Sequence, residues 1–232
     1  MNRLTSNATH SKHLQMLNVM KMRAASLLLS SVFFFTFSGY AQDTVEPSLN
    51  TEEIELTSWL DSQEENMLEM LERITNINSG SLNKQGVNEL ASIFGEELRH
   101  LGFSLSTLPG EVIEMPSCPG SDYNVDVADH ILASKSGSGS KLLIMGHLDT
   151  VFPPGSPFQE FSREGDTMYG PGVSDMKGGL VVMLYALKAL NESGELGDKS
   201  ITVLLNSDEE MGSLSSRKYL EEQALLHDWG LV

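Results

Sequence analysis

Apolar residues recur at helical spacing in two stretches of the first half of the chain. From Trp59 to Ile77 apolar side chains recur at near-helical spacing, and the polar run NINSGSLNKQG then interrupts the pattern. A second stretch, VNELASIFGEELRHLG, repeats this spacing and closes with Gly102, a residue suited to cap the end of a helix. The pattern therefore predicts two amphipathic helices that each pack one face against a core.

Continuous apolar runs in the second half predict buried strands. The run LLIM is followed by Gly146 and then His147, and the apolar run from Ile201 to Leu205 is followed after two residues by three acidic residues. Between them, the segment from Leu180 to Leu190 is apolar on most faces, as expected of a helix that covers a sheet. The segment HILASKSGSGSKLLIMGH predicts two further strands joined as a hairpin by a flexible serine-glycine turn.

The order strand, helix, strand indicates an α/β fold with a right-handed crossover. We expect three layers, in which an open and mostly parallel sheet is flanked by helices. Because parallel strands end at the same edge of a sheet, the polar residues that follow them should converge there. The residues expected to meet at this edge are His147, Asp149, Asp175, Glu209 and Glu210.

The net charge of the chain limits the classes of partner that it can bind. The 232 residues carry a formal net charge of −17, and the first 41 residues contain basic but no acidic side chains, so the remainder is more acidic still. Such a surface repels the phosphates of nucleic acids and of anionic membranes, and it attracts cations. We therefore expect no nucleic-acid partner.

The N-terminal region resembles an export signal. Residues 20–41 begin with Lys21 and Arg23, continue with an apolar stretch and finish with small residues, which predicts a signal peptide that is cleaved after Ala41. The stretch is too short and too interrupted for a stable membrane span, so we expect a periplasmic or secreted protein. The single Cys118 cannot form an internal disulfide and is expected to be an ordinary thiol.

These signals divide the chain into four parts. Residues 1–19 are interpreted as a mis-annotated extension, residues 20–41 as the signal peptide and residues 42–58 as an acidic linker without periodicity. Residues 59–232 are expected to form the N-terminal part of a catalytic domain.

Taken singly, a histidine or a carboxylate is a weak signal, because most such residues are solvated or hydrogen-bonded. Several carboxylates gathered at one buried edge are costly without a cation, since like charges and desolvation both oppose their ionisation. Imidazole and carboxylate together suit Zn²⁺, and a pair of ions needs one carboxylate that reaches both. Asp175, in a glycine-punctuated loop, occupies a suitable position for that bridge.

Three separated motifs, GHLDTVF, YGPGVSDMKGG and NSDEEMGS, resemble in order and spacing the two-zinc exopeptidases of family M20, and especially its glutamate carboxypeptidases. The likeness extends to NSGSLNKQGV and SSRKYLEEQA. It implies that His147 binds one zinc, that Asp175 bridges both and that Glu210 binds the other. It further implies that Asp149 orients His147, that Glu209 is the general acid/base, and that the peptide bond after Asp175 is cis.

The resemblance implies that a metal-activated water cleaves the amide next to a C-terminal amino acid, with glutamate as the expected residue and a small peptide or N-acyl amino acid as the substrate. Two alternatives remain: an N-acyl amino acid deacylase of the same family, and a catalytically inactive truncated relic. Further zinc ligands and a lid domain expected of the family do not occur before Val232. We therefore expect an incomplete catalytic domain that is inactive alone and that forms a homodimer only where a lid is present.

Overall fold

The structure is a computed structural model, and it describes residues 49–115 and 123–232. The predicted signal peptide, residues 42–48 of the predicted linker and Cys118 lie outside the described residues. No helix in the described ranges is both long enough and apolar enough to cross a membrane.

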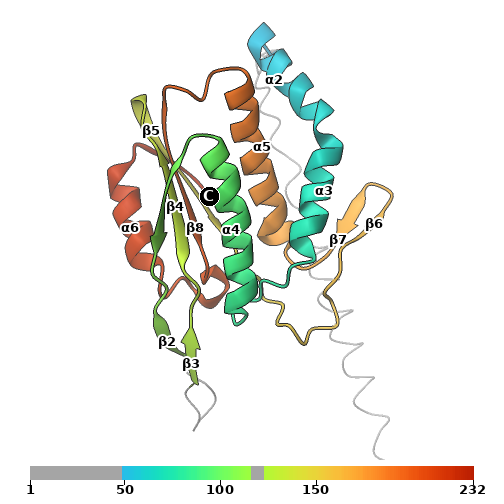
Figure 1. Ribbon diagram of the computed structural model, residues 1–232, viewed down its shortest axis with the longest axis vertical. Helices are drawn as coiled ribbons and strands as arrows, with labels where there is room; N and C mark the ends of the chain where they lie inside the picture. Colours follow the sequence, from blue (N-terminus) through green and yellow to red (C-terminus); the bar gives the residue numbers. More distant parts are fainter. Residues whose placement is uncertain (1–48, 116–122) are drawn as a thin grey trace, which may run out of the picture. The chain divides into compact units, whose positions relative to one another are not determined.

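Three helices precede the first strand (Figure 1): α2 (Thr51–Ser62), α3 (Glu64–Thr75) and α4 (Lys84–His100). The first of them corrects the predicted linker, because α2 begins at Thr51, well before residue 58. Asn50 and Glu53 form a capping box, in which each side chain accepts a hydrogen bond from the other's backbone N–H. Periodicity alone missed this helix because none of its residues is buried.

The predicted second helix is confirmed as α4. Its buried side chains, among them Leu90, Phe94 and Leu98, form the stripe that the spacing indicated. Gly102 follows the helix with φ of 81°, a left-handed conformation that favours glycine and turns the chain toward the first strand.

The central sheet has five strands in the order β1-β4-β8-β5-β9. β4 is antiparallel to both of its neighbours, whereas β8, β5 and β9 are mutually parallel. The sheet is therefore mixed, yet four of its five strands run in one direction, as the prediction of a mostly parallel sheet requires. The strands are β1 (Ser104–Leu108), β4 (His130–Lys135), β5 (Ser138–His147), β8 (Lys199–Asn206) and β9 (Trp229–Leu231).

The predicted hairpin of β4 with β5 is wrong. Both strands exist, but β8 lies between them and pairs with each. β8 is buried along most of its length, so it needs a neighbouring strand on both edges. The short connection passes tightly over the start of β8, because a Cβ on Gly137 would lie 2.0 Å from the carbonyl oxygen of Asp198.

Helices cover both faces of the sheet. α4 contacts β1 and β4, α6 (Arg217–Leu226) contacts β5, and Figure 1 shows α6 across the sheet from α4 and α5 (Gly178–Glu192). Alternate β8 residues Ile201, Val203 and Leu205 belong to the main core together with α4 and α5. The predicted three-layer architecture is confirmed.

Two small hairpins lie outside the main sheet. The first joins β2 (Val112–Met115) to β3 (Tyr123–Asp126), and the second joins β6 (Ser162–Glu164) to β7 (Thr167–Tyr169). Two irregular turns flank the longer elements: η1 (Val173–Lys177) precedes α5, and η2 (Glu209–Met211) follows β8.

Candidate metal centre

The polar residues expected to converge do so at the carboxyl ends of β5 and β8. His147 is the last residue of β5 and lies beside Asn206, the last residue of β8. Asp175 belongs to η1, which leads into α5, and Glu209 and Glu210 belong to η2. One sheet edge thus collects side chains that are separated by up to 63 positions in the chain.

Three of these side chains face one another closely. His147, Asp175 and Glu210 each offer a ligand atom, and these atoms all lie within 4.8 Å of one another. His147 Nε2 is 3.0 Å from Asp175 Oδ1 and 4.0 Å from Glu209 Oε2. The group has the size of a site for a metal ion, with a further carboxylate at its rim.

The imidazole of His147 is held from its far side. Its Nδ1 lies 3.0 Å from the backbone oxygen of Asp149 and 3.5 Å from Asp149 Oδ1. A neutral ring that donates from Nδ1 has the lone pair of Nε2 available on the side of Asp175. The nearer partner is the backbone carbonyl, so Asp149 contacts the ring with main chain as well as side chain.

The carboxylate of Asp149 has a second set of partners that sequence reasoning missed. It is fully buried and accepts hydrogen bonds from the backbone N–H groups of Glu209, at 3.1 Å, and Glu210, at 3.2 Å. It also accepts the hydroxyl of Ser81 at 2.7 Å. The segment NSGSLNKQGV contains Ser81, but its pattern carried no indication of this contact.

Burial and neighbouring groups shift the pKa values of two residues at the site. Burial alone would lower the pKa of His147, but its hydrogen bonds to Asp149 and Asp175 raise that pKa to about 9. Burial raises the pKa of Glu210, and the neighbouring carboxylates raise it further. A bound cation would relieve this repulsion, because it favours the ionised form of each carboxylate.

The donor set fits zinc. One imidazole nitrogen and two carboxylate oxygens are ligands that Zn²⁺ accepts in catalytic sites, and softer sulfur ligands are absent from this cluster. The residues present thus agree with the expected metal. They supply three ligand groups, fewer than a pair of four-coordinate ions requires.

The turn that carries Asp175 is anchored by Lys177. This lysine is only 1% exposed, and its Nζ donates a hydrogen bond of 2.9 Å to the backbone oxygen of Ile77. Burial lowers the pKa of Lys177 to about 8. The peptide bond between Asp175 and Met176 is cis, which confirms the expectation drawn from the family resemblance.

Asp208, the first of the three consecutive acids, does not join the cluster. Its carboxylate accepts hydrogen bonds from the backbone N–H of Ser215, at 2.6 Å, and from the hydroxyl of Ser216, at 2.6 Å. Asp208 is buried and fixes the turn that precedes α6. Only the second and third acids therefore face the metal centre.

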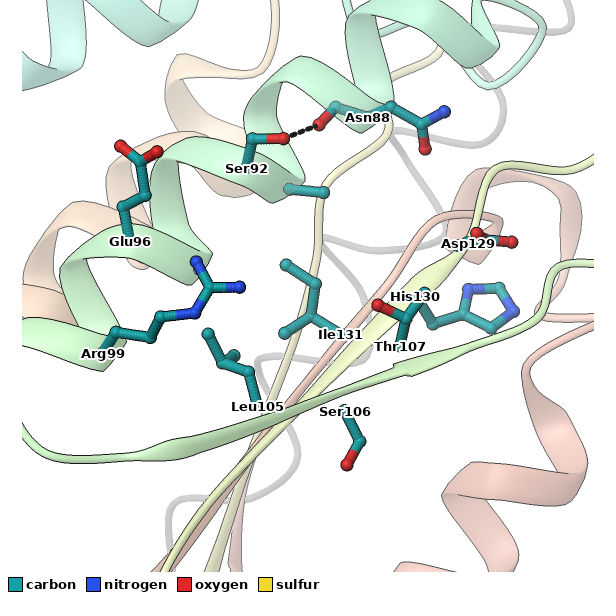
Figure 2. Close-up of a pocket in the computed structure, with 12 residues that line it drawn as sticks. Asn88, Ser92, Glu96, Arg99, Leu105, Ser106, Thr107, Asp129, His130 and Ile131 are labelled. Atoms are coloured by element: carbon teal, nitrogen blue, oxygen red, sulfur yellow. Dashed lines mark hydrogen bonds between the residues drawn. The ribbon is translucent and has the colours of Figure 1, made fainter.

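Two of the cavities in the described part of the chain differ in their relation to the site. A cavity of about 300 Å³ opens between α4 and the strands β1 and β4 (Figure 2), and its lining includes Arg99 of α4, Leu105 of β1 and Ile131 of β4. None of the residues at the metal centre lines it. A second cavity, of about 250 Å³, adjoins Glu210 and is lined largely by apolar side chains, including Leu82, Val151 and Met211.

Residues 143–231 match the sequence profile of peptidase family M20/M25/M40, a span that contains all three ligand candidates and both neighbouring acids. Residues 143–231 therefore carry the sequence features of peptidase family M20.

A curated relative is carboxypeptidase G2 of Pseudomonas sp. strain RS-16. It is 36% identical over 170 residues, which cover 71% of this chain and 37% of the relative. Another relative is the succinyl-diaminopimelate desuccinylase of Nautilia profundicola, 35% identical over 116 residues, which cover 46% of this chain and 30% of the relative. The chain thus spans about a third of the length of these enzymes.

Solved structures show the same fold. Human carnosine dipeptidase 1 superposes with a TM-score of 0.65 at 17% identity, over 76% of this chain and 40% of that protein. The M20 metallo-carboxypeptidase Sso-CP2 of Sulfolobus solfataricus gives a TM-score of 0.52 at 24% identity, over 71% of this chain and 36% of that protein. The described part of the chain therefore has the fold of M20 catalytic domains.

Proposed function

We propose that this chain carries part of the catalytic centre of a zinc-dependent exopeptidase or amidohydrolase that cleaves the amide next to a C-terminal amino acid. The observation that supports it most strongly is the convergence of His147, Asp175 and Glu210 within 4.8 Å at one sheet edge. The match of residues 143–231 to family M20 supports hydrolysis of a peptide or amide bond as the reaction class.

In this proposal the three clustered residues hold the metal. His147 and Asp175 would bind one zinc ion, Asp175 and Glu210 would bind a second, and both ions would share the carboxylate of Asp175. Zinc at such a site supplies a Lewis acid for the scissile carbonyl and lowers the pKa of water. The position of Asp149, two residues after His147, lets it orient that ring through both its backbone oxygen and its carboxylate.

Glu209 is the proposed general acid/base. Its side chain is 52% exposed and its Oε2 lies 4.0 Å from His147 Nε2, so it borders the cluster while remaining open to a substrate. It would accept a proton from the attacking water and deliver that proton to the leaving amine. Its neighbour Glu210 is more buried and lies inside the cluster, which suits a ligand rather than a proton carrier.

The proposed substrates are small peptides or N-acyl amino acids that release glutamate, by likeness to carboxypeptidase G2. A deacylase is the second candidate, favoured by two succinyl-diaminopimelate desuccinylases that are 35% and 36% identical over the matched residues. The two candidates share the bond that is cleaved and differ in which half of the substrate is recognised.

The test is hydrolysis by the full chain loaded with zinc. N-benzoyl-glutamate and an N-succinyl amino acid are incubated with the protein, and the released amine is measured by mass spectrometry. We expect at most slight release above a zinc-free control, because each of two ions would have only two of the clustered side chains as ligands, and Glu209→Gln is the matched inactive variant. Hydrolysis that Glu209→Gln leaves unchanged would show that another group, or a contaminant, performs the reaction.

A further inference from the structure

The segment Ser79–Ser81 forms a short parallel bridge with the loop that follows β5. Gly80 pairs with Thr150, the N–H of Ser81 donates to the Thr150 oxygen at 3.1 Å, and the N–H of Thr150 donates to the Ser79 oxygen at 2.9 Å. These bonds fix the segment between α3 and α4 against the loop that carries Asp149.

Gly80 permits this approach. A Cβ at this position would lie 2.4 Å from the carbonyl oxygen of Phe152, well inside any tolerated contact. The backbone of the segment therefore lies directly on the loop, and the side chain of the next residue reaches the buried interior.

The hydroxyl of Ser81 reaches the carboxylate of Asp149. Its Oγ is 2.7 Å from Asp149 Oδ2 and 3.4 Å from the Thr150 oxygen, so the carboxylate is the closer acceptor. The same Oδ2 accepts the N–H of Glu210, and Oδ1 accepts the N–H of Glu209. One buried carboxylate thus links Ser81 to the turn that presents both glutamates.

We propose that Ser81 is a positioning residue of the metal centre. Its hydrogen bond fixes the rotation of the Asp149 carboxylate, so that each oxygen faces one backbone N–H of the η2 turn and Oδ1 stays beside the His147 ring. Ser81 thereby sets the direction of His147 and Glu210 without touching metal or substrate. The inference deepens the proposed function and rests on it for the role of those two residues.

Ser79 provides a matched control within the same segment. It is completely buried, it lies two residues from Ser81, and its hydroxyl has no hydrogen-bond partner among the described residues. Ser79→Ala therefore removes the same group from the same segment without changing the contact with Asp149. Ser81→Ala removes that contact, and Ser81→Thr retains a hydroxyl.

Two readouts on the full chain test the proposal. In zinc-free protein, amide hydrogen exchange at Glu209 and Glu210 is followed by NMR, and we expect it to accelerate about tenfold in Ser81→Ala, because a hydrogen bond to a charged group is lost. Zinc affinity is measured by calorimetry, and we expect it to fall about tenfold, as for other residues that orient metal ligands. Ser79→Ala should match the wild type in both, and Ser81→Thr should restore most of the loss.

Equal exchange rates in Ser81→Ala and Ser79→Ala would overturn the proposal, whatever the zinc affinity. If Ser81→Ala does not fold, Ser81→Cys keeps the size with a weaker donor and should give a smaller acceleration of the same amides. If the wild-type chain binds no zinc, the proposed metal centre is refuted. If amide exchange at Glu209 and Glu210 is nevertheless faster in Ser81→Ala than in the wild type, the positioning role of Ser81 is still supported.

Discussion

His147 Nε2 lies 3.0 Å from Asp175 Oδ1. Two ligands of one tetrahedral zinc ion, with bonds of about 2.0–2.1 Å, lie about 3.3 Å apart. The two side chains therefore need to separate only slightly to admit an ion between them. The spacing of the two side chains is close to that needed to bind a metal ion, because both residues lie on elements of secondary structure, the end of β5 and the turn before α5.

Asp175 and Glu209 should differ in what their loss removes. We expect Asp175→Ala to abolish zinc binding in the full chain, because the proposed bridge between the ions is lost. Glu209→Gln should leave zinc affinity within about threefold while it lowers any hydrolysis rate by about 10²–10⁴-fold, the range typical of general acid–base catalysis. Calorimetry and the hydrolysis assay measure the two effects separately.

The exposed carboxylate Glu221, on α6, supplies the control for a general loss of negative charge. Glu221→Gln should change neither the zinc affinity nor the hydrolysis rate. An equal loss of zinc in Asp175→Ala and Glu209→Gln would contradict the division of roles between them.

His130 should make the fold less stable in mild acid. Burial lowers its pKa, against the opposing effect of Asp208, Asp129 and Asp149 and with a smaller lowering contribution from Lys218. Its Nδ1 accepts the N–H of Ser207 at 3.1 Å, which requires an unprotonated nitrogen. The unfolded chain then binds more protons than the folded one below about pH 6.5, so the free energy of unfolding falls as pH falls through this range.

Urea unfolding of the full chain between roughly pH 5 and 6.5 measures this slope. His130→Asn offers an amide oxygen in place of Nδ1 and should flatten it, whereas His100→Gln, on the exposed end of α4, should keep it. His147 affects stability in a different pH range. Because its pKa is raised in the fold, it stabilises the metal-free fold below about pH 6.5, and that contribution is lost as pH rises through about 9. A slope unchanged in His130→Asn would show that other groups cause it.

The fold and the converging residues were predictable because both depend on local patterns. Apolar runs before His147 and before Glu209 gave β5 and β8, and the intervening apolar helix made them parallel neighbours, so their ends had to coincide. The contact of Ser81 with Asp149 was not predictable in this way. It joins residues 68 positions apart, and a serine in a polar turn has no periodic signal.

The order of the strands in the sheet could not be predicted from the apolar pattern either. β4 and β5 follow each other closely in the chain, which favours a hairpin, but the insertion of β8 between them is decided by burial on both of its edges. The helix α2 was missed because none of its residues is buried, so it has no apolar periodicity. Its capping box, formed by Asn50 and Glu53, is a local signal for the start of a helix, but the polar and acidic composition of the segment favoured a linker.

Gly80 should be less tolerant of substitution than an exposed glycine. In Gly80→Ala the new Cβ meets the Phe152 oxygen at 2.4 Å, so we expect the free energy of unfolding to fall by about 1–3 kcal/mol, the usual cost of overpacking. Gly155→Ala adds the same methyl group where no atom lies within 4 Å, and it should be nearly neutral. Equal urea midpoints for the two variants would show that the loop yields to the added methyl group.

The segment of residues 20–41 predicts export, and it lies outside the described residues. We expect the mature protein to begin at Gln42, since small residues precede that position. Mass spectrometry of the N-terminus, after expression in a bacterial host, checks it. Ala41→Leu should block cleavage, whereas a mature protein that retains Phe33 in the wild type would contradict the prediction.

The full chain should bind zinc weakly and should show little or no hydrolysis. His147, Asp175 and Glu210 supply three ligand groups, so of two ions each would have only two protein ligands, with Asp175 shared. Catalytic zinc usually has three protein ligands and one open position. Because the free energy of metal binding contributes to folding, weak binding also leaves the domain less stable.

Exposed apolar residues at the sheet edge add to this expectation. Trp229 and Leu231 of the edge strand β9 are 69% and 57% exposed, and Leu225 of α6 is 88% exposed. An edge strand with apolar side chains favours association between chains. We expect size-exclusion chromatography to show concentration-dependent oligomers, which Trp229→Lys should reduce. Tight binding of two zinc ions, with turnover of N-benzoyl-glutamate by a monodisperse protein, would prove both expectations wrong.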